Sequence, residues 1–154
     1  MIDWNKKKLG IVVMTVGEMC AIECIKSFKE HTKQPHDLIV WYNCIDGFKE
    51  AFFNRLMSLT NDVIACTKNK GGIEAWGFST MYLNYDYIIM ATCDIEVRQG
   101  YLDKLSDPFR FYDKLVISGQ ASYNETWLAH SIWQPSRLCP DKVTLIDRAR
   151  LNDI

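Results

Sequence analysis

Two carboxylates one residue apart, Asp94 and Glu96, follow the apolar run 87–91. A run of this length, rich in β-branched and aromatic residues and followed by the polar turn 98–100, is typical of a buried strand. Carboxylate oxygens are the ligands that Mg²⁺ and Mn²⁺ prefer, and these cations often share them with substrate phosphates. The pair therefore indicates a site for a divalent cation beside a phosphate. Two solvated surface charges, one of them paired with Arg98, are the alternative.

Strands and helices alternate along the chain up to that pair. The apolar residues predict strands over 9–14, 38–42, 62–66 and from 87 onward, the first and the last of them buried, with helices over 18–30, 48–59 and 73–83. Such alternation predicts right-handed βαβ units, and hence an α/β fold with a mostly parallel sheet and helices on both faces. The further expected features are a cap at Asp46, a short helix over 100–105, strands over 114–118 and 143–146, and a helix over 125–133.

The composition is that of an ordinary globular chain. Its 154 residues, 48% hydrophobic and 24% charged with a formal net charge of −1, fit one domain with a sizeable core. The charge balance shows no excess of positive charge of the kind that binds nucleic acid. The polar start 1–8 and the short apolar run after it fit neither a secretion signal nor a membrane span, so we expect a cytoplasmic protein.

The cysteines suggest packing rather than chemistry. They form no CxxC pair and have no spacing typical of a zinc site. We therefore expect small buried hydrophobic residues in a reducing compartment. The six are Cys20, Cys24, Cys44, Cys66, Cys93 and Cys139.

Polar turns follow the earlier strands as well. Residues 15–18 follow the first strand and residues 42–46 follow the second. Gly71 and Gly72 precede a helix, where backbone amides and partial positive charge suit a phosphate. Such loops, converging at the carboxyl edge of a parallel sheet, form a site for a nucleotide-like ligand. The sequence has neither a P-loop nor a GxGxxG fingerprint, which argues against a nucleotide hydrolase or a dehydrogenase.

The order of these turns resembles a known family. From Lys8 to about Leu105 the chain is similar to the nucleotide-binding half of GT-A glycosyltransferases, particularly the inverting family-two type. In that family three turns follow the first three strands: Thr-aromatic-Asn, hydrophobic-Asp-Asn-Gly-Ser and Asn-x-Gly. The fourth strand begins with Asp-Tyr and ends in an Asp-x-Asp metal motif, which is commonly followed by Glu-Val and Gly-aromatic-Leu. The matching segments here are Thr15-Val16-Gly17, 41–46, Asn69-Lys70-Gly71, Asp86-Tyr87 and 92–102.

The resemblance implies a GT-A, Rossmann-like fold and a nucleotide diphosphate sugar as donor, most often a UDP-sugar, with Mn²⁺ or Mg²⁺ bridging the diphosphate. Asp94 takes the position of the metal-binding Asp. Thr92 replaces the first Asp of the motif, so Glu96 would supply part of the metal ligation. The family's late histidine ligand would be His130, for which packing between tryptophans is the alternative. The implied nucleotide-binding residues are Thr15, Val16, Glu18, Tyr42, Asn43, Asn69, Gly71, Thr92 and Cys93. Tyr42 replaces the family's uracil-binding acid and could stack on a base.

An inverting transfer also needs a carboxylate base that deprotonates the acceptor hydroxyl. In the family this base lies in the acceptor-binding half, beyond the metal motif. The candidates here are Glu125 and, behind it, Asp141. We expect one GT-A-like domain, with 8–105 as the nucleotide-sugar-binding core and 106–154 as an abbreviated C-terminal part that lacks most of the acceptor-binding half. Aromatic residues of that part would suit contacts in a homo-oligomer.

Three functions follow from these residues. The first is a metal-dependent glycosyltransferase of the hexosyltransferase type that passes the sugar to an unknown acceptor. The second is a catalytically weak or inactive nucleotide-sugar-binding module whose partner binds the acceptor. The third, a nucleotidyltransferase, would need a glycine- and basic-rich first loop, and residues 15–18 do not supply one.

Overall fold

One mixed sheet organises the part of the chain that the computed structural model describes, which is residues 2–111, 117–120, 128–130 and 143–148. Its strand order is β3-β2-β1-β4-β7-β5-β6. The first four strands are parallel to one another, and β7, β5 and β6 continue the sheet in antiparallel pairs. The strands are β1 Leu9–Thr15, β2 His36–Asn43, β3 Asp62–Cys66, β4 Tyr87–Thr92, β5 Ile117–Gln120, β6 Leu128–His130 and β7 Val143–Asp147.

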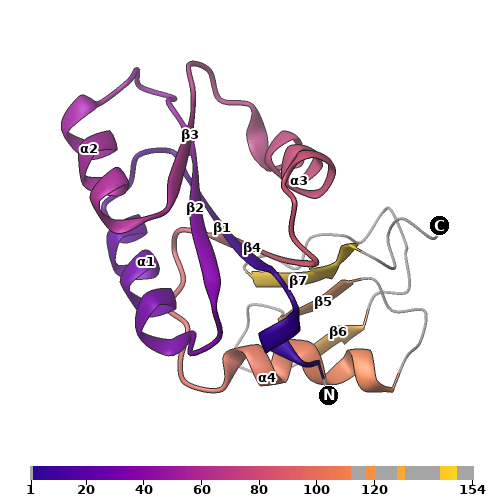
Figure 1. Ribbon diagram of the computed structural model, residues 1–154. Coiled ribbons are helices and arrows are strands. Elements are labelled where there is room, and N and C mark those ends of the chain that lie inside the picture. The colour runs from indigo at the N-terminus through magenta and orange to yellow at the C-terminus, as the bar shows by residue number, and fades with distance from the viewer. Residues whose placement is uncertain (1, 112–116, 121–127, 131–142, 149–154) are drawn as a thin grey trace.

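Helices cover both faces of the sheet, as the sequence predicts. Helices α1 Cys20–His31 and α2 Glu50–Leu59 lie on one side, and α3 Gly71–Tyr82 lies on the other (Figure 1). Short helical segments η1 Trp4–Lys6, α4 Tyr101–Ser106 and η2 Asp107–Arg110 complete the described elements. Along β1, alternate residues serve the two faces: Val13 packs into the core beneath α1 and α2, whereas Val12 packs with Ala75 of α3.

The central strands are buried from both sides. In β1 and β4, the residues Ile11, Val13, Ile88 and Ile89 are 0% exposed. Removing such a side chain from water stabilises the fold by about 1.5–3 kcal/mol. Continuous apolar runs in these strands are therefore what a parallel sheet with two covered faces requires. None of the helices among the described residues is long and apolar enough to cross a membrane.

Two sequence predictions are wrong. The helix expected over 125–133 is contradicted at Leu128–His130, which is strand β6, with Ala129 paired to Gly119 of β5. The spacing of apolar residues in this segment is typical of a helix, but pairing with a neighbouring strand decides its conformation. Asp46 does not cap the second helix, because α2 begins at Glu50 after Lys49, with no side-chain cap.

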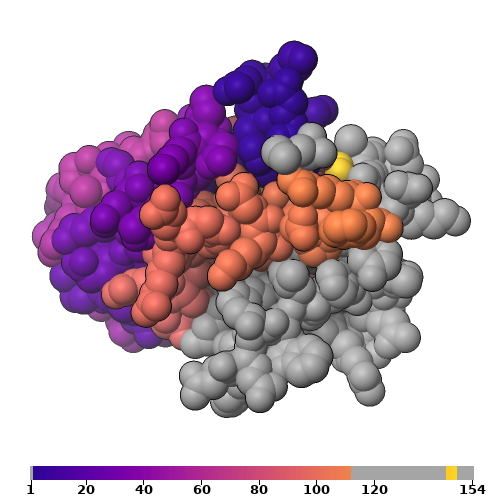
Figure 2. Space-filling model, turned by 90° about the horizontal axis from the view of Figure 1, so that it is seen from below, coloured from indigo at the N-terminus to yellow at the C-terminus, as the bar shows by residue number. Residues whose placement is uncertain are grey.

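Helix α4 and η2 pack on the face of the sheet that α1 and α2 cover. Seen from below, they form a band that runs beside the N-terminal residues (Figure 2). Tyr87 of β4 lies between Trp4 and Phe109, with ring centroids 5.2 and 6.2 Å away. Tyr101 packs edge-on against Phe28 of α1. These contacts fix α4, which follows the two carboxylates in the chain, against the core.

A buried hydrogen bond joins α4 to the end of α1, and we expect its loss to destabilise the fold. The hydroxyls of Tyr101 and Thr32 lie 2.6 Å apart, and both residues are buried. Tyr101→Phe leaves the Thr32 hydroxyl buried without this partner, so the free energy of unfolding should fall by about 1–3 kcal/mol. Urea denaturation measures this. Adding Thr32→Val should recover most of the loss, and a double variant no more stable than Tyr101→Phe would contradict the assignment.

Candidate functional site at the carboxyl edge of the sheet

The carboxyl ends of the first four strands lie level with one another. Thr15 pairs with Tyr42, Met14 pairs with Thr92, and the end of β2 pairs with Cys66 of β3. The polar turns that follow these strands therefore meet at a single edge of the sheet, as the sequence predicts. This is the edge at which parallel α/β sheets bind ligands.

The turn after β1 is held by the side chain of Thr15. Its Oγ1 accepts hydrogen bonds from the backbone amides of Gly17, at 3.0 Å, and Glu18, at 3.3 Å. Gly17 has a φ of +102°, and a Cβ there would lie 3.2 Å from the Tyr42 ring, so a larger residue would be strained. Val16 is half-buried, and Glu18 is exposed. The turn thus brings one carboxylate to the edge on a fixed backbone.

Two asparagines organise the neighbouring turns. The Oδ1 of buried Asn43 accepts from Trp41 Nε1 at 3.0 Å and from the Lys70 amide at 3.1 Å. The Oδ1 of Asn69 accepts from the amide of Gly71 at 2.8 Å, at the start of α3. Gly71 has a φ of +71°, which favours glycine. Asn43 and Asn69 therefore fix the backbone that leads into α3.

Tyr42 belongs to the core. Its side chain is 0% exposed, and its ring contacts Phe48 and Phe52. Burial raises the pKa of the Tyr42 hydroxyl, so the group keeps its proton. A ring enclosed in this way offers no open face to a base, and the expected stacking role is wrong. Alternation along β2 places Tyr42 on the same sheet face as Val40, beneath the helices.

The two carboxylates of the opening motif lie beyond the end of β4. Asp94 and Glu96 are exposed, whereas Val97 is buried. Thr92 Oγ1 donates a hydrogen bond to Asp94 Oδ1 at 2.6 Å. The donor set is therefore two accessible carboxylates and a hydroxyl, all oxygen, which fits Mn²⁺ or Mg²⁺. Thr92, at the position where the resembling family has Asp, orients Asp94.

The thiol of Cys93 links this motif to the turn after β1. Its Sγ donates to Glu18 Oε2 at 3.0 Å, and burial, followed by that hydrogen bond, raises the pKa of the thiol. Cys20, which the sequence predicts to be buried, is exposed, and its sulfur lies 3.7 Å from that of Cys93. In the sequence, only its position just after the first turn indicates that it lies near the site. The fold thus adds Cys20 to the candidate site.

Burial, with a smaller effect of the nearby Cys20, Asp94 and Glu96, raises the pKa of Cys24 from 9.0 to about 12. The folded state holds this proton more tightly than the unfolded state does. The contribution to stability is therefore complete below pH 9 and is lost as the pH rises toward 12. We expect this group to lower the free energy of unfolding by about 1.4 kcal/mol per pH unit in that window.

Chemical denaturation at several pH values tests the prediction for Cys24. The slope of stability against pH between 9 and 11 should be less steep in Cys24→Ala than in the wild type. Other buried hydroxyls, such as that of Tyr101, whose pKa burial also raises, remain in both proteins and cancel in the comparison. Equal slopes would show that the Cys24 thiol is not buried in this way.

The structure does not bring His130 to the two carboxylates. His130 lies in β6, which is separated from β4 by β7 and β5. The strand order therefore gives no support to the metal-ligand role of His130, which stays a prediction. Glu125 and Asp141, the candidate bases, lie outside the described residues.

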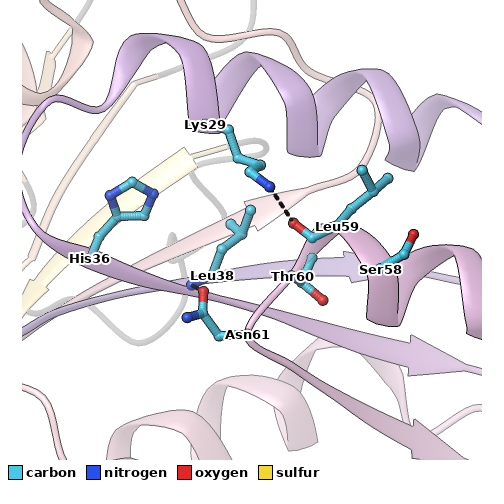
Figure 3. A pocket seen from close by; sticks show the side chains of 7 residues that line it. All are labelled: Lys29, His36, Leu38, Ser58, Leu59, Thr60 and Asn61. Atoms are coloured by element: carbon cyan, nitrogen blue, oxygen red, sulfur yellow. Dashed lines mark hydrogen bonds between the residues drawn. The ribbon is translucent and has the colours of Figure 1, made fainter.

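A cavity of about 350 Å³ lies at the opposite edge of the sheet (Figure 3). Its lining includes His36 and Leu38 at the start of β2, and Lys29 donates a hydrogen bond to the Leu59 carbonyl across it. Ligands of parallel sheets collect at the carboxyl ends of the strands, whereas this cavity borders their amino ends. The turns around Asp94 remain the better candidate site.

Solved structures share this arrangement of strands and helices. The chain matches GalNAc-T7 with UDP, GalNAc and Mn²⁺ at a TM-score of 0.66 and 12% identity, over 98% of this chain and 36% of that one. The chain has the GT-A fold. Mannosyltransferase PcManGT from Pyrobaculum calidifontis, in complex with GDP-Man and Mn²⁺, matches at a TM-score of 0.64 and 12% identity, over 96% and 46% of the two chains. TarS 1–349 from S. aureus matches at 0.62 and 15%, over 95% and 48%.

The GT-A fold confirms the fold class and the resemblance that the sequence predicts. All three matched proteins are glycosyltransferases. The chain spans less than half the length of each of them. No family model and no curated protein sequence matches the chain. At 12–15% identity the structural likeness defines the fold, and the activity must be argued from the site.

Proposed function

We propose that the chain binds the nucleoside diphosphate of a nucleotide sugar at the carboxyl edge of its sheet, with a divalent cation, and acts as a glycosyltransferase. The observation that carries the proposal is the meeting of the Thr15–Glu18 turn with the Asp94 motif, through the 3.0 Å contact of Cys93 with Glu18. In the matched PcManGT and GalNAc-T7 structures a nucleotide or nucleotide sugar is bound together with Mn²⁺. Uracil is the base that the resemblance favours.

Each of the site residues would have its own role. Asp94 and Glu96 would hold the cation, and Thr92 keeps the Asp94 carboxylate in place through its hydrogen bond. A bound Mn²⁺ or Mg²⁺ supplies positive charge that stabilises a diphosphate leaving group. Backbone groups of Val16, with Glu18, border the nucleotide. Thr15 contributes by fixing that turn.

The α3 turn would lie along the other side of the nucleotide. Asn69 and Gly71 shape the start of a helix of twelve residues, and the partial positive charge at a helix N-terminus favours an anion. Asn43 positions this turn from beneath through the Lys70 amide. The base that accepts the acceptor proton is assigned to Glu125.

A catalytically inactive nucleotide-sugar-binding module is the second candidate function. Thr92 favours it, because the motif has one carboxylate fewer than the Asp-x-Asp pattern that it resembles. Hydrolysis of a UDP-sugar in the absence of acceptor separates the two functions. A transferase should release UDP slowly in a Mn²⁺-dependent manner, whereas a binding module should bind the donor and leave it intact.

Calorimetric titration tests donor binding directly. UDP and GDP are titrated into the wild-type chain with Mn²⁺ and again with the metal removed by a chelator. We expect UDP to bind more tightly than GDP, and the affinity for UDP to fall at least about tenfold without metal, which corresponds to 1.4 kcal/mol. Binding that is undetectable, or that is equally tight with and without metal, would overturn the proposal.

We further propose that the chain forms a homo-oligomer. Helix α3 keeps Ile73 90% exposed and Met81 70% exposed, and contact with a second copy of the chain would remove these apolar side chains from water. Light scattering at micromolar concentration should give a mass of at least two chains, and Ile73→Lys with Met81→Lys should reduce it. A monomer mass for the wild type at that concentration would contradict self-association.

A further inference from the structure

A second cluster of possible metal ligands lies beside the carboxyl edge and is distinct from the Asp94 and Glu96 pair. It consists of Glu18, Cys20 and Cys93, whose ligand atoms all lie within 4.8 Å of one another. The two sulfurs are 3.7 Å apart, and Cys93 Sγ is 3.0 Å from Glu18 Oε2. The cysteines are 73 positions apart in the sequence, so only the fold brings them together.

The separation of the sulfurs distinguishes metal binding from disulfide formation. Tetrahedral Zn²⁺ with Zn–S bonds of about 2.3 Å holds two thiolates about 3.8 Å apart. A disulfide requires about 2.05 Å between the sulfurs. The observed 3.7 Å matches the first value, so Cys20 and Cys93 could hold a metal ion without moving apart or closing.

We propose that Glu18, Cys20 and Cys93 form a binding site for a thiophilic divalent cation such as Zn²⁺. Two thiolates and a carboxylate are ligands that Zn²⁺ accepts, and three protein ligands leave a fourth position open to water or a small ligand. On binding, each thiol gives its proton to solvent and forms a metal–sulfur bond. The site does not depend on the proposed glycosyl transfer.

The three ligands come from separate, well-fixed parts of the fold. Glu18 stands on the turn that Thr15 holds, Cys20 is the first residue of α1, and Cys93 follows β4. Cys93 is 5% exposed, whereas Glu18 and Cys20 are exposed. An ion can therefore enter from solvent and meet a sulfur that the core holds in position. Ligands on fixed backbone are what a specific metal site needs.

Titration with Co²⁺, a spectroscopic substitute for Zn²⁺, tests the site in the reduced protein. The wild type should bind one equivalent and develop the near-ultraviolet charge-transfer band of a cobalt–thiolate bond, and Zn²⁺ should abolish that band. Cys20→Ser changes an exposed residue and should preserve the fold by circular dichroism, yet bind Co²⁺ at least tenfold more weakly. Cys66→Ser alters a half-buried thiol outside the cluster and should behave as the wild type.

Two results would overturn the site. One is a wild-type protein that shows no cobalt–thiolate band when the reductant keeps its thiols reduced. The other is a Cys20→Ser variant whose band and affinity equal those of the wild type, which would assign the binding to other thiols. Because the readout is metal spectroscopy, it is independent of whether UDP binds.

Discussion

Replacement of Asp94 by Asn should abolish most of the metal-dependent binding of UDP. The carboxylate lies exposed beyond β4, and Thr92 orients it through a 2.6 Å hydrogen bond. The amide keeps the size of the side chain but removes its negative charge, which a hard cation requires. Loss of groups that merely support a metal ligand costs about 10- to 100-fold in affinity, so loss of the ligand should cost at least that much. Calorimetry with Mn²⁺ measures the change.

Two further variants test whether the loss of binding is specific to Asp94. Glu96→Gln should weaken binding less than Asp94→Asn, because Glu96 is assigned an auxiliary part. Glu30→Gln removes an exposed carboxylate from the C-terminal end of α1, at the opposite edge of the sheet, and should bind as the wild type does. If Asp94→Asn and Glu30→Gln bind UDP and Mn²⁺ equally well, the metal is not held at Asp94.

Gly10→Ala should destabilise the fold more than other single-methyl changes. A Cβ at this position would lie 2.6 and 2.9 Å from ring carbons of Tyr85, well inside normal contact. The ring cannot turn away freely, since the Tyr85 hydroxyl donates to Asp37 Oδ2 at 2.9 Å. Overpacking of this kind costs about 1–3 kcal/mol. Urea denaturation of the variant should show a free energy of unfolding lowered by that amount.

Gly77→Ala is the matched control for Gly10→Ala. A Cβ at Gly77 meets nothing within 4 Å, and the residue lies inside α3. Alanine is a better helix former than glycine by about 0.8–1.0 kcal/mol, so this variant should be as stable as the wild type or more stable. A Gly10→Ala protein as stable as Gly77→Ala would mean that Tyr85 does not pack over β1.

The sequence predicts the core of the fold because its local signals agree. Apolar runs such as 62–66 define strands, and the alternation of strands with helices leaves few topologies. The meeting of residues 15–18 with Asp94 follows from that topology alone. The sequence gives less information about which way a side chain at the end of a strand points. Tyr42 is expected at such an end, and only the packing of the helices shows that its ring faces the core.

Other features depend on long-range contacts that leave no local signal. The approach of Cys20 to Cys93 depends on how α1 begins beside the end of β4. The strand at Leu128–His130 depends on pairing with β5, whereas its sequence spacing indicates a helix. The sheet order also separates His130 of β6 from β4, which the sequence does not indicate. Pairing partners distant in sequence decide such cases.

Binding of a nucleoside diphosphate at the carboxyl edge, through a cation on Asp94, can be observed by anomalous X-ray scattering from Mn²⁺ in crystals grown with UDP and MnCl₂. We predict one strong peak within bonding distance of Asp94 and of both UDP phosphates, with the uridine along the turn that Thr15 fixes. UDP bound elsewhere, for example in the cavity beside Lys29 and His36, or a Mn²⁺ peak remote from Asp94, would contradict a donor site at this edge.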